Sequence, residues 1–484
     1  MVAVPRLSEA TLQELPDTVA RPAYARAAVT TAILHFGPGA FHRAHQCAYF
    51  DALLALDPRW GICQVSLLPT PLREALLPQD RLYTLVEMGE HKRLSIIGSV
   101  TEILLGNEAR AQAMARLISP QIKAVTMTVT ENGYCQTQDG ALDTSRPEVV
   151  HDLAQPREPV GVVGWIVEGL RARRAAGHAP FAAISCDNLL DNGTRLRRSV
   201  LAFAQAIDRD LAKWIEDEVA FPRTMVDSIV PATDQALCDD VRALLGLEDA
   251  WPVKRENFVQ WVIEDLPASP ARQWTGAGVT VTKDISAYDR AKLRLLNGAH
   301  STLAYVGAIN GISTIREAMD TPPLARFVEK LMREDILPTL PAPADFSLAD
   351  YIDTVLRRFR NPAMHHLTAQ IAWDGSQKLG PRLLSTVADA LKTGRSLTRL
   401  GVPIAAWMLF IRMKTAKGEP ITDPLRDTLA SVAADCSGSA AADVPKFLAL
   451  DAVFPRKLAV NEPFVAAVSA AYDALAAKGL AALL

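Results

Sequence analysis

Three polar side chains within one short segment could carry out acid-base chemistry on a carbonyl group. The segment runs from Asp289 to His300 and holds Lys292, Asn297 and His300 among leucines. If it forms an α-helix, these side chains fall within an arc of about 140° that also includes Asp289. An ammonium, a carboxamide and an imidazole that converge can move a proton and stabilise an oxyanion. A mixed helix face with solvated polar ends is the alternative that this spacing leaves open.

A second segment, near the N-terminus, is typical of nucleotide binding. Residues 31–45 place an apolar strand before Gly37 and Gly39, and a helix is expected to follow. Such glycines let the backbone approach a pyrophosphate, which the N-terminus of the helix attracts. The match to the dinucleotide pattern is partial, because other residue types stand where a third glycine is expected. The residues predicted to contact the cofactor at this turn are Gly37, Pro38, Gly39, Ala40, Phe41 and His42.

Two later segments extend this interpretation. Residues 61–67 follow at the spacing of a βαβ unit, but Ser66 and its successors lack the acidic residue that usually holds the adenosine ribose. The choice between NAD and NADP is therefore left open. The β-branched residues 122–130 are typical of a buried strand, and Thr130 and Glu131 stand at the end that faces the ligand in a parallel sheet. Ser66, Thr130 and Glu131 are accordingly expected at the cofactor.

Two more polar residues stand at or within apolar strands. Asn188 follows the strand-like residues 181–186 and is a candidate donor to the substrate, although Asp187 and Asn188 could equally cap the next helix. Asp227 is a single carboxylate in an apolar segment bracketed by prolines, and buried carboxylates are uncommon unless paired. Asp227 is therefore a candidate substrate ligand, while a structural ion pair explains it nearly as well.

The composition indicates a cytoplasmic protein with a small-molecule partner. The chain has 484 residues, 49% hydrophobic content and a net charge of -3 with mixed signs. It can bury a large core, and no surface for nucleic acid or a membrane is indicated. The six cysteines are scattered singly, and the apolar segments, the C-terminal one included, are judged too short to span a membrane. Reduced thiols, no secretion signal and a monomer or small homo-oligomer are expected.

The composition changes near residue 285. Strands alternate with helices before it, whereas nearly every later segment has helical periodicity. The sequence predicts an α/β fold: a Rossmann-type NAD(P)-binding domain over residues 1–285, and an all-α substrate and catalytic domain over residues 286–484. The pairs His42 with His45 and His365 with His366 match no known ligand motif, so no metal is expected.

Taken in order, these segments resemble the mannitol dehydrogenase family, the polyol-specific long-chain dehydrogenases. The matching segments are HFGPGAFHRAHQ at 35–46, TVTENGY at 128–134, SCDN at 185–188, MVD at 225–227, QWVIED at 260–265 and KLRLLNGAH at 292–300. The resemblance implies an enzyme that transfers a hydride, without a metal, between a nicotinamide cofactor and a ketose or polyol. NAD is the expected cofactor, and NADP is not excluded.

The resemblance also implies roles for individual residues. Lys292 is expected to be the general acid/base, while Asn188 and Asn297 donate hydrogen bonds to the substrate oxygen and His300 orients it. Asp289 stands where the family has a glutamate that takes part in proton passage. A lysine used in this way needs its pKa lowered towards neutrality, which burial can provide.

Within the family, residues 39–41, 60–63 and 370–378 resemble the fructuronate reductase branch, which interconverts D-fructuronate and D-mannonate. Gln370 stands where mannitol dehydrogenases often have an arginine, which bears on the substrate end group. A carboxylate needs a cation, and Lys378 and Arg43 are the candidates. Gly380 departs from the proline usual in this branch. A mannitol 2-dehydrogenase or arabinitol 4-dehydrogenase acting on an uncharged polyol is the alternative, and a non-catalytic nucleotide-binding sensor is the second.

Overall fold

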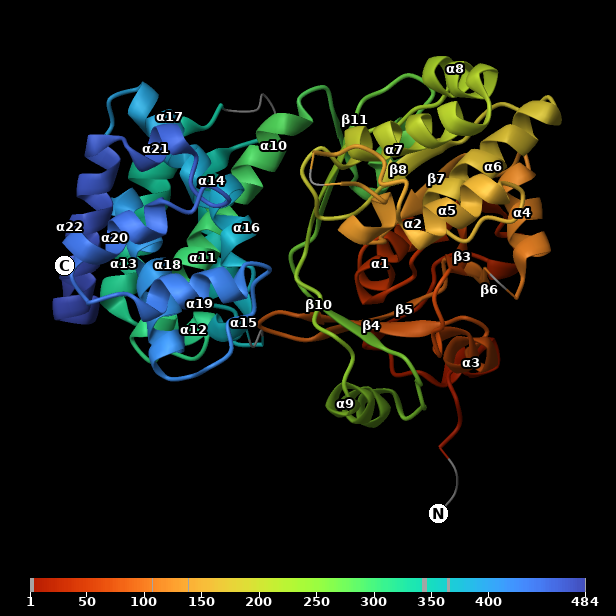
Figure 1. Cartoon of the computed structure of the whole chain (residues 1–484). Coiled ribbons are helices and arrows are strands. Elements are labelled where there is room, and N and C mark those ends of the chain that lie inside the picture. The colour runs from red at the N-terminus through yellow and green to blue at the C-terminus, as the bar shows by residue number, and fades with distance from the viewer. Residues whose placement is uncertain (1–3, 107, 138, 342–345, 364–365, 484) are drawn as a thin grey trace. The chain divides into compact units, whose positions relative to one another are not determined.

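The protein is described by a computed structural model that covers residues 4–106, 108–137, 139–341, 346–363 and 366–483 (Figure 1). The chain divides into two compact units, Met1–Ile285 and Ser286–Leu484. Each unit has its own arrangement of elements, so the two are described separately.

A parallel sheet of five strands forms the centre of the first unit. Its strands follow the spatial order β6-β3-β2-β7-β8. The Cα partners of Phe36 are Val65 and Met127, and Met127 is in turn the partner of Ser185. Four neighbouring strands therefore end at the same edge of the sheet. The strands are β2 (Thr31–Phe36), β3 (Gly61–Ser66), β6 (Val100–Leu105), β7 (Ala124–Met127) and β8 (Ala182–Ser185).

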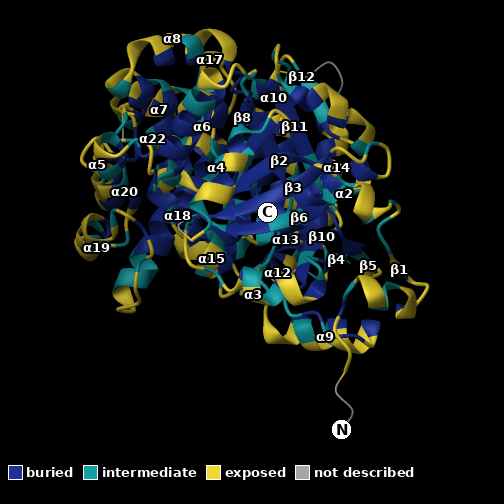
Figure 2. Cartoon of the chain, turned by 90° about the vertical axis from the view of Figure 1, so that its right-hand side faces the viewer, coloured by how far each residue is buried: buried dark blue, intermediate teal, exposed yellow. Residues whose placement is uncertain are grey.

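Both faces of this sheet are covered, which is why its strands read as nearly continuous apolar runs. Successive side chains point to opposite faces, so Leu34 belongs to one core cluster and Ile33 to another. Trp165 fills the first cluster, and Trp274 fills the second. Figure 2 shows β2 and β3 as buried strands. The covering helices include α2 (Gln46–Leu54), α4 (Arg110–Ile118), α6 (Val162–Ala175) and α7 (Asn192–Ile207).

Two smaller sheets complete the first unit. An antiparallel hairpin over residues 83–97 belongs to a separate four-stranded sheet and is not inserted into the parallel one. That sheet contains β1 (Val19–Ala20), β5 (Arg93–Ile97), β4 (Tyr83–Met88) and β10 (Val253–Glu256). The third sheet contains β12 (Thr280–Thr282), β11 (Gln260–Glu264) and β9 (Thr224–Asp227).

The second unit is helical in all the elements that its described residues form. Three of these elements are π-helices, in which each hydrogen bond spans one residue more than in an α-helix. They are η6 (Lys292–Gly298), η7 (Leu331–Ile336) and η9 (Gly380–Leu384). The α-helices that matter for the site are α10 (Ile285–Ala291), α11 (Ala299–Ile309), α14 (Leu348–Phe359), α15 (Thr368–Ile371), α16 (Gly375–Leu379), α18 (Thr398–Ala416) and α22 (Glu462–Lys478).

The C-terminal helix corrects one expectation from the sequence. Residues Glu462–Leu483 form a segment of 22 residues that is long and apolar enough to cross a membrane by length and composition alone. A helix that packs within a domain can meet the same criterion. Here α22 packs against α18 and buries Phe464 and Tyr472. This packing accounts for the apolar residues that are buried, which make up 28% of the apolar window.

Candidate active site

The glycine turn after β2 has the geometry that close backbone approach requires. Gly37 has a φ of +83°, and a Cβ atom there would lie 2.2 Å from the carbonyl oxygen of Thr128. Gly39 begins the short helix α1 (Ala40–Ala44), and the nearest atom to a Cβ placed on it would be 3.9 Å away. The first glycine is thus required by the fold, whereas the second leaves open space beside the backbone. These features fit the phosphates of a dinucleotide.

Two histidines support this turn from its buried side. The rings of His35 and His42 are stacked with centroids 3.3 Å apart, and His35 Nδ1 lies 2.7 Å from Thr126 Oγ1. Burial lowers the pKa of His35 to about 3 and also lowers that of His42, so both rings are neutral at pH 7. The side chain of His42 is fully buried. Its predicted contribution to cofactor binding can therefore come only through its backbone or the shape of the turn.

Arg43, a candidate for the substrate carboxylate, is occupied within the core of the first unit. Its side chain is 1% exposed, and its Nη1 donates to the carbonyl oxygen of Trp251 at 2.6 Å. Its guanidinium also lies over the ring of Tyr83, and burial lowers its pKa to about 10. This arrangement gives Arg43 a structural role. The expectation that Arg43 holds a substrate end group is therefore wrong, because the side chain is buried and already hydrogen-bonded.

Thr130 and Asp187 meet at the ligand-facing edge of the parallel sheet. Thr130 has φ 60° and ψ 177°, a conformation that is nearly restricted to glycine. Its N–H donates to Asp187 Oδ1 at 2.8 Å, and the Tyr134 hydroxyl donates to Asp187 Oδ2 at 2.8 Å. Burial raises the pKa of Asp187, and hydrogen bonds from Tyr134 and Thr130 oppose that rise. A buried carboxylate therefore holds a strained backbone directly before Glu131, which is exposed at the start of η4 (Glu131–Tyr134).

Three other predicted residues of the first unit stand at strand ends. Asn188 is exposed and follows β8. Ser66 ends β3, and its hydroxyl donates to the carbonyl oxygen of Leu68 at 2.7 Å. Asp227 is buried at the end of β9. The residue at the N-cap of α7 is Asp191, so Asp187 and Asn188 do not cap that helix as the alternative proposed.

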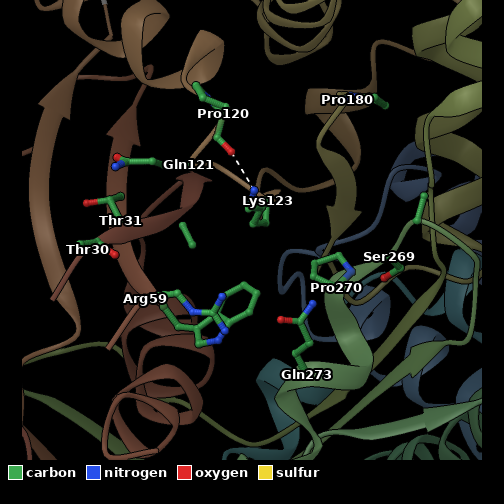
Figure 3. Close-up of a pocket in the computed structure, with 13 residues that line it drawn as sticks. Thr30, Thr31, Arg59, Pro120, Gln121, Lys123, Pro180, Ser269, Pro270 and Gln273 are labelled. Atoms are coloured by element: carbon green, nitrogen blue, oxygen red, sulfur yellow. Dashed lines mark hydrogen bonds between the residues drawn. The ribbon is translucent and has the colours of Figure 1, made fainter. Parts of the chain in front are cut away.

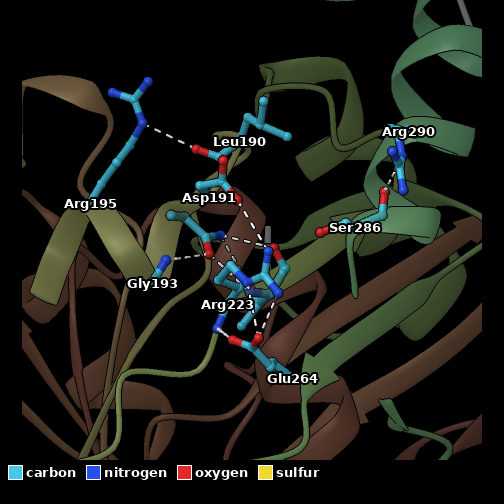
Figure 4. Close-up of polar contacts among 10 residues, drawn as sticks. Leu190, Asp191, Gly193, Arg195, Arg223, Glu264, Ser286 and Arg290 are labelled. Carbon is cyan, nitrogen blue, oxygen red and sulfur yellow. Dashed lines mark hydrogen bonds and ion pairs between the residues drawn. The ribbon is translucent and has the colours of Figure 1, made fainter. Parts of the chain in front are cut away.

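An ion-pair network braces the start of β9. Arg223 pairs with Glu264 at 2.6 Å and with Asp191 at 3.3 Å (Figure 4). Because Glu264 ends β11 and Asp191 precedes α7, the network ties β9 to both elements. It thereby fixes the strand that carries Asp227.

The candidate catalytic segment of the second unit is not the regular α-helix that the sequence predicts. The chain passes from α10 into the π-helix η6, which begins at Lys292, and then into α11. An α-helix separates residues five apart, such as Lys292 and Asn297, by about 140°. A π-turn contains more residues than an α-turn, so it brings these two side chains closer to one face. Single π-turns within helices are frequent at functional sites.

The polar residues of this segment are enclosed to different degrees. Asp289 and Lys292 are each 7% exposed, while Asn297 and His300 are half-buried. The His300 ring lies 5.3 Å from that of Phe359, and its Nε2 has no hydrogen-bond partner among the described residues. Desolvation lowers the pKa of His300, and nearby positive charges lower it further. The cationic side chains that contribute are those of Arg382, Arg358 and Lys378. His300 is therefore a neutral imidazole at pH 7.

The remaining candidates for the substrate end group lie near α15 and α16. Gln370 is exposed on α15. Lys378 donates to the carbonyl oxygen of Trp373 at 2.6 Å and lies 3.8 Å from Asp374 Oδ2. Burial lowers the pKa of Lys378. The sequence interpretation missed Arg382 and Ser301, because no local pattern shows that these two residues, 81 positions apart, are hydrogen-bonded.

A cavity of about 700 Å³ in the first unit lies away from these residues. Its lining includes residues at or just before the starts of β2, β7 and β8, namely Thr31, Lys123 and Pro180 (Figure 3). Ligands of open parallel sheets bind at the carboxyl ends of the strands, and this cavity is at the opposite edge. Among the described residues, no group of three or more His, Cys, Asp or Glu could hold a metal, and His365 lies outside those residues.

Comparisons with known proteins cover nearly the whole chain. Residues 31–276 match the model of the mannitol dehydrogenase Rossmann domain, and residues 284–476 match that of the mannitol dehydrogenase C-terminal domain. The fold class expected from the sequence, a Rossmann-type domain followed by a mostly helical one, is thereby confirmed.

Individual relatives agree with the family models. D-mannonate oxidoreductase of Escherichia coli K12 is 41% identical over 95% of this chain and 96% of its own length. The ternary complex of Pseudomonas fluorescens mannitol 2-dehydrogenase with NAD and D-mannitol has 34% identity and a TM-score of 0.83, covering 99% of this chain and 98% of that one. A substrate-free D-sorbitol dehydrogenase has 32% identity and a TM-score of 0.91, with 99% of each chain covered.

Proposed function

Because the chain belongs to the mannitol dehydrogenase family of NAD(P)-dependent dehydrogenases, we propose that it interconverts D-fructuronate and D-mannonate with NAD as the cofactor. The observation that carries this choice of substrate is the 41% identity to D-mannonate oxidoreductase, compared with 34% and 32% to the two polyol dehydrogenases of known structure. Gln370 agrees with it, since mannitol dehydrogenases often have an arginine at that position. We expect the enzyme to work in the cytoplasm.

The residues of the first unit are suited to hold the cofactor. The turn at Gly37 and Gly39 would accept the pyrophosphate, and the residues after β7 would lie towards the nicotinamide, where Thr130 has its strained backbone. When bound, the nicotinamide supplies or accepts the hydride. No acidic residue directly follows β3, so we test NAD against NADP directly.

The residues of the second unit are suited to acid-base work on the substrate oxygen. Lys292 is nearly buried and, as the proposed general acid/base, would accept the proton of an alcohol. Asn297 and, in the first unit, Asn188 would donate hydrogen bonds to the oxygen as its charge develops. The neutral His300 would orient it. Asp289, also nearly buried, would take part in proton passage from Lys292.

The test of this proposal is a substrate panel. We expect NADH to be oxidised with D-fructuronate at a kcat/KM at least about 100-fold above that with D-fructose, since a site built for a charged group rejects the analogue that lacks it. Turnover of D-fructose without D-fructuronate would contradict the proposal. It would favour the second candidate, a polyol dehydrogenase, which the likeness to mannitol 2-dehydrogenase supports. The same panel with NADPH determines the cofactor preference.

A separate variant tests whether the chain is a catalyst or a nucleotide-binding sensor. Lys292→Ala is expected to lower kcat at least about 1000-fold while NADH still binds, because the general acid/base acts in the chemical step. NADH fluorescence measures binding in the same sample. An unchanged rate would remove Lys292 from the mechanism.

A further inference from the structure

Arg382 is a mostly buried cation without a carboxylate partner in the described part of the chain. Its Nη1 donates to Ser301 Oγ at 3.0 Å, and its other guanidinium donors have no protein acceptor among those residues. Two other arginines of the same unit differ from it, because Arg294 pairs with Asp389 at 2.7 Å and Arg399 pairs with Asp335. Burial lowers the pKa of Arg382 despite the opposite influence of Tyr305 and Asp374. None of its nitrogens is among the fully buried atoms of the described residues that lack a hydrogen-bond partner, so the unused donors are open to solvent and available to an anion.

The position of Arg382 relates it to the catalytic segment. Its hydrogen-bond partner Ser301 directly follows His300, and Arg382 is close enough to lower the pKa of that histidine. The π-helices η6 and η9, which carry Lys292 and Arg382, pack against each other. Gly298 allows this close packing, because a Cβ atom there would lie 2.9 Å from the carbonyl oxygen of Arg382.

Three cationic side chains lie close enough to His300 to affect its pKa. Arg382, Arg358 and Lys378 all lower the pKa of His300, and Lys378 already has Trp373 and Asp374 as neighbours. Arg358 is 5% exposed. Of the three, Arg382 combines a mostly buried position with unused donors on a planar group, which is the geometry that recognises a carboxylate in bidentate fashion.

We propose that Arg382, held by Ser301, binds the carboxylate of a hexuronate substrate and is the residue that selects sugar acids over neutral sugars. This inference rests on the proposed function and assigns a residue to its substrate preference. D-fructuronate and D-fructose differ at one terminal carbon, which is a carboxylate in the first and a hydroxymethyl group in the second. A cation at that terminus therefore distinguishes them without changing the reacting carbonyl.

The variant Arg382→Gln tests the proposal, with Arg395→Gln as the matched control. Arg395 is exposed in the same unit, so its variant has the same change in charge away from the site. We expect Arg382→Gln to lower kcat/KM for D-fructuronate by about 10- to 100-fold, mainly through KM, which is the loss of one charged hydrogen-bond pair. The value for D-fructose should change less than about twofold, and the control should change neither. Equal losses with both substrates, or no loss with either, would overturn the proposal.

A second readout separates this proposal from the choice of substrate. If the wild-type enzyme does not reduce D-fructuronate, the proposed function fails, and D-mannonate is then tested as an inhibitor of the reaction with D-fructose. Inhibition of the wild type that weakens at least about tenfold in Arg382→Gln would support the anion site, and absence of inhibition would overturn it.

Thermal melting and NADH binding identify a variant that fails to fold. If Arg382→Gln fails to fold, Ser301→Ala is used in its place, because it keeps the arginine and removes the hydroxyl that accepts its hydrogen bond. This variant is expected to raise KM for D-fructuronate by about 3- to 10-fold and to leave KM for D-fructose unchanged. An unchanged KM for D-fructuronate in Ser301→Ala would overturn the proposal.

Discussion

Replacement of Asp187 should uncouple the strained turn at Thr130 from the sheet edge that carries Asn188. The carboxylate accepts hydrogen bonds from the Thr130 N–H and from the Tyr134 hydroxyl, each at 2.8 Å. Asp187→Ala removes both acceptors. Asp187→Asn is the matched variant, because its carbonyl oxygen can still accept from Thr130 while its NH₂ group replaces the oxygen that faces Tyr134.

The magnitude follows from these contacts. Two hydrogen bonds to a charged group contribute about 1.5–3 kcal/mol each. Their loss is offset in part, because the strained backbone of Thr130 costs about 1–3 kcal/mol and can relax in the variant. Tyr134 also keeps its hydrogen bond to Ser185 Oγ. Asp187→Ala should therefore lower the free energy of unfolding by about 2–4 kcal/mol, and Asp187→Asn by about 1 kcal/mol.

Denaturant unfolding, NADH binding and steady-state kinetics check this prediction together. Because Asn188 is the next residue, both variants should lower kcat more than they weaken NADH binding, with a loss of about 10-fold or more for Asp187→Ala. An alanine variant as stable as the wild type would refute the reasoning from hydrogen bonds. Wild-type kcat in a destabilised alanine variant would refute the link from Asp187 to the position of Asn188.

Three further predictions use matched variants or pH. Gly37→Ala should lower the melting temperature and weaken NADH binding at least about tenfold, because φ is +83° and a Cβ atom would overlap the backbone. Gly39→Ala should weaken NADH binding and leave the melting temperature unchanged. A Gly37→Ala variant as stable as the wild type would contradict this prediction. Gly298→Ala should raise KM for the sugar without changing NADH affinity, whereas Gly380→Ala, whose Cβ would meet nothing within 4 Å, should change neither. The pKa of His35 is lowered to about 3, so its contribution to stability is present above pH 6.5 and is lost as the pH falls towards 3. Between pH 6 and 4 the wild type should lose about 1.4 kcal/mol of unfolding free energy per pH unit more than His35→Asn, and parallel curves from denaturant titrations would contradict this.

The fold class could be predicted from the sequence because its signals are local. A strand followed by Gly37 and Gly39 indicates a dinucleotide fold, since a positive φ and close approach depend on the glycines themselves. Helical periodicity after residue 285 indicates a helical second half in the same way. The family models match over both parts of the chain. The spacing of Lys292, Asn297 and His300 also marked out a candidate catalytic segment, although not the winding of its helix.

Only the tertiary structure decided which of these polar groups are enclosed and what they contact. Arg43 lies in the core on the carbonyl of Trp251, 208 residues away, and Tyr134 reaches Asp187 across 53 residues. The π-helix at Lys292 packs against a second π-helix, whose Arg382 is hydrogen-bonded to Ser301. Burial, counter-ions and the winding of a helix depend on partners that are distant along the chain. Local residue patterns do not encode those partners, which is why these features became visible only in the folded protein.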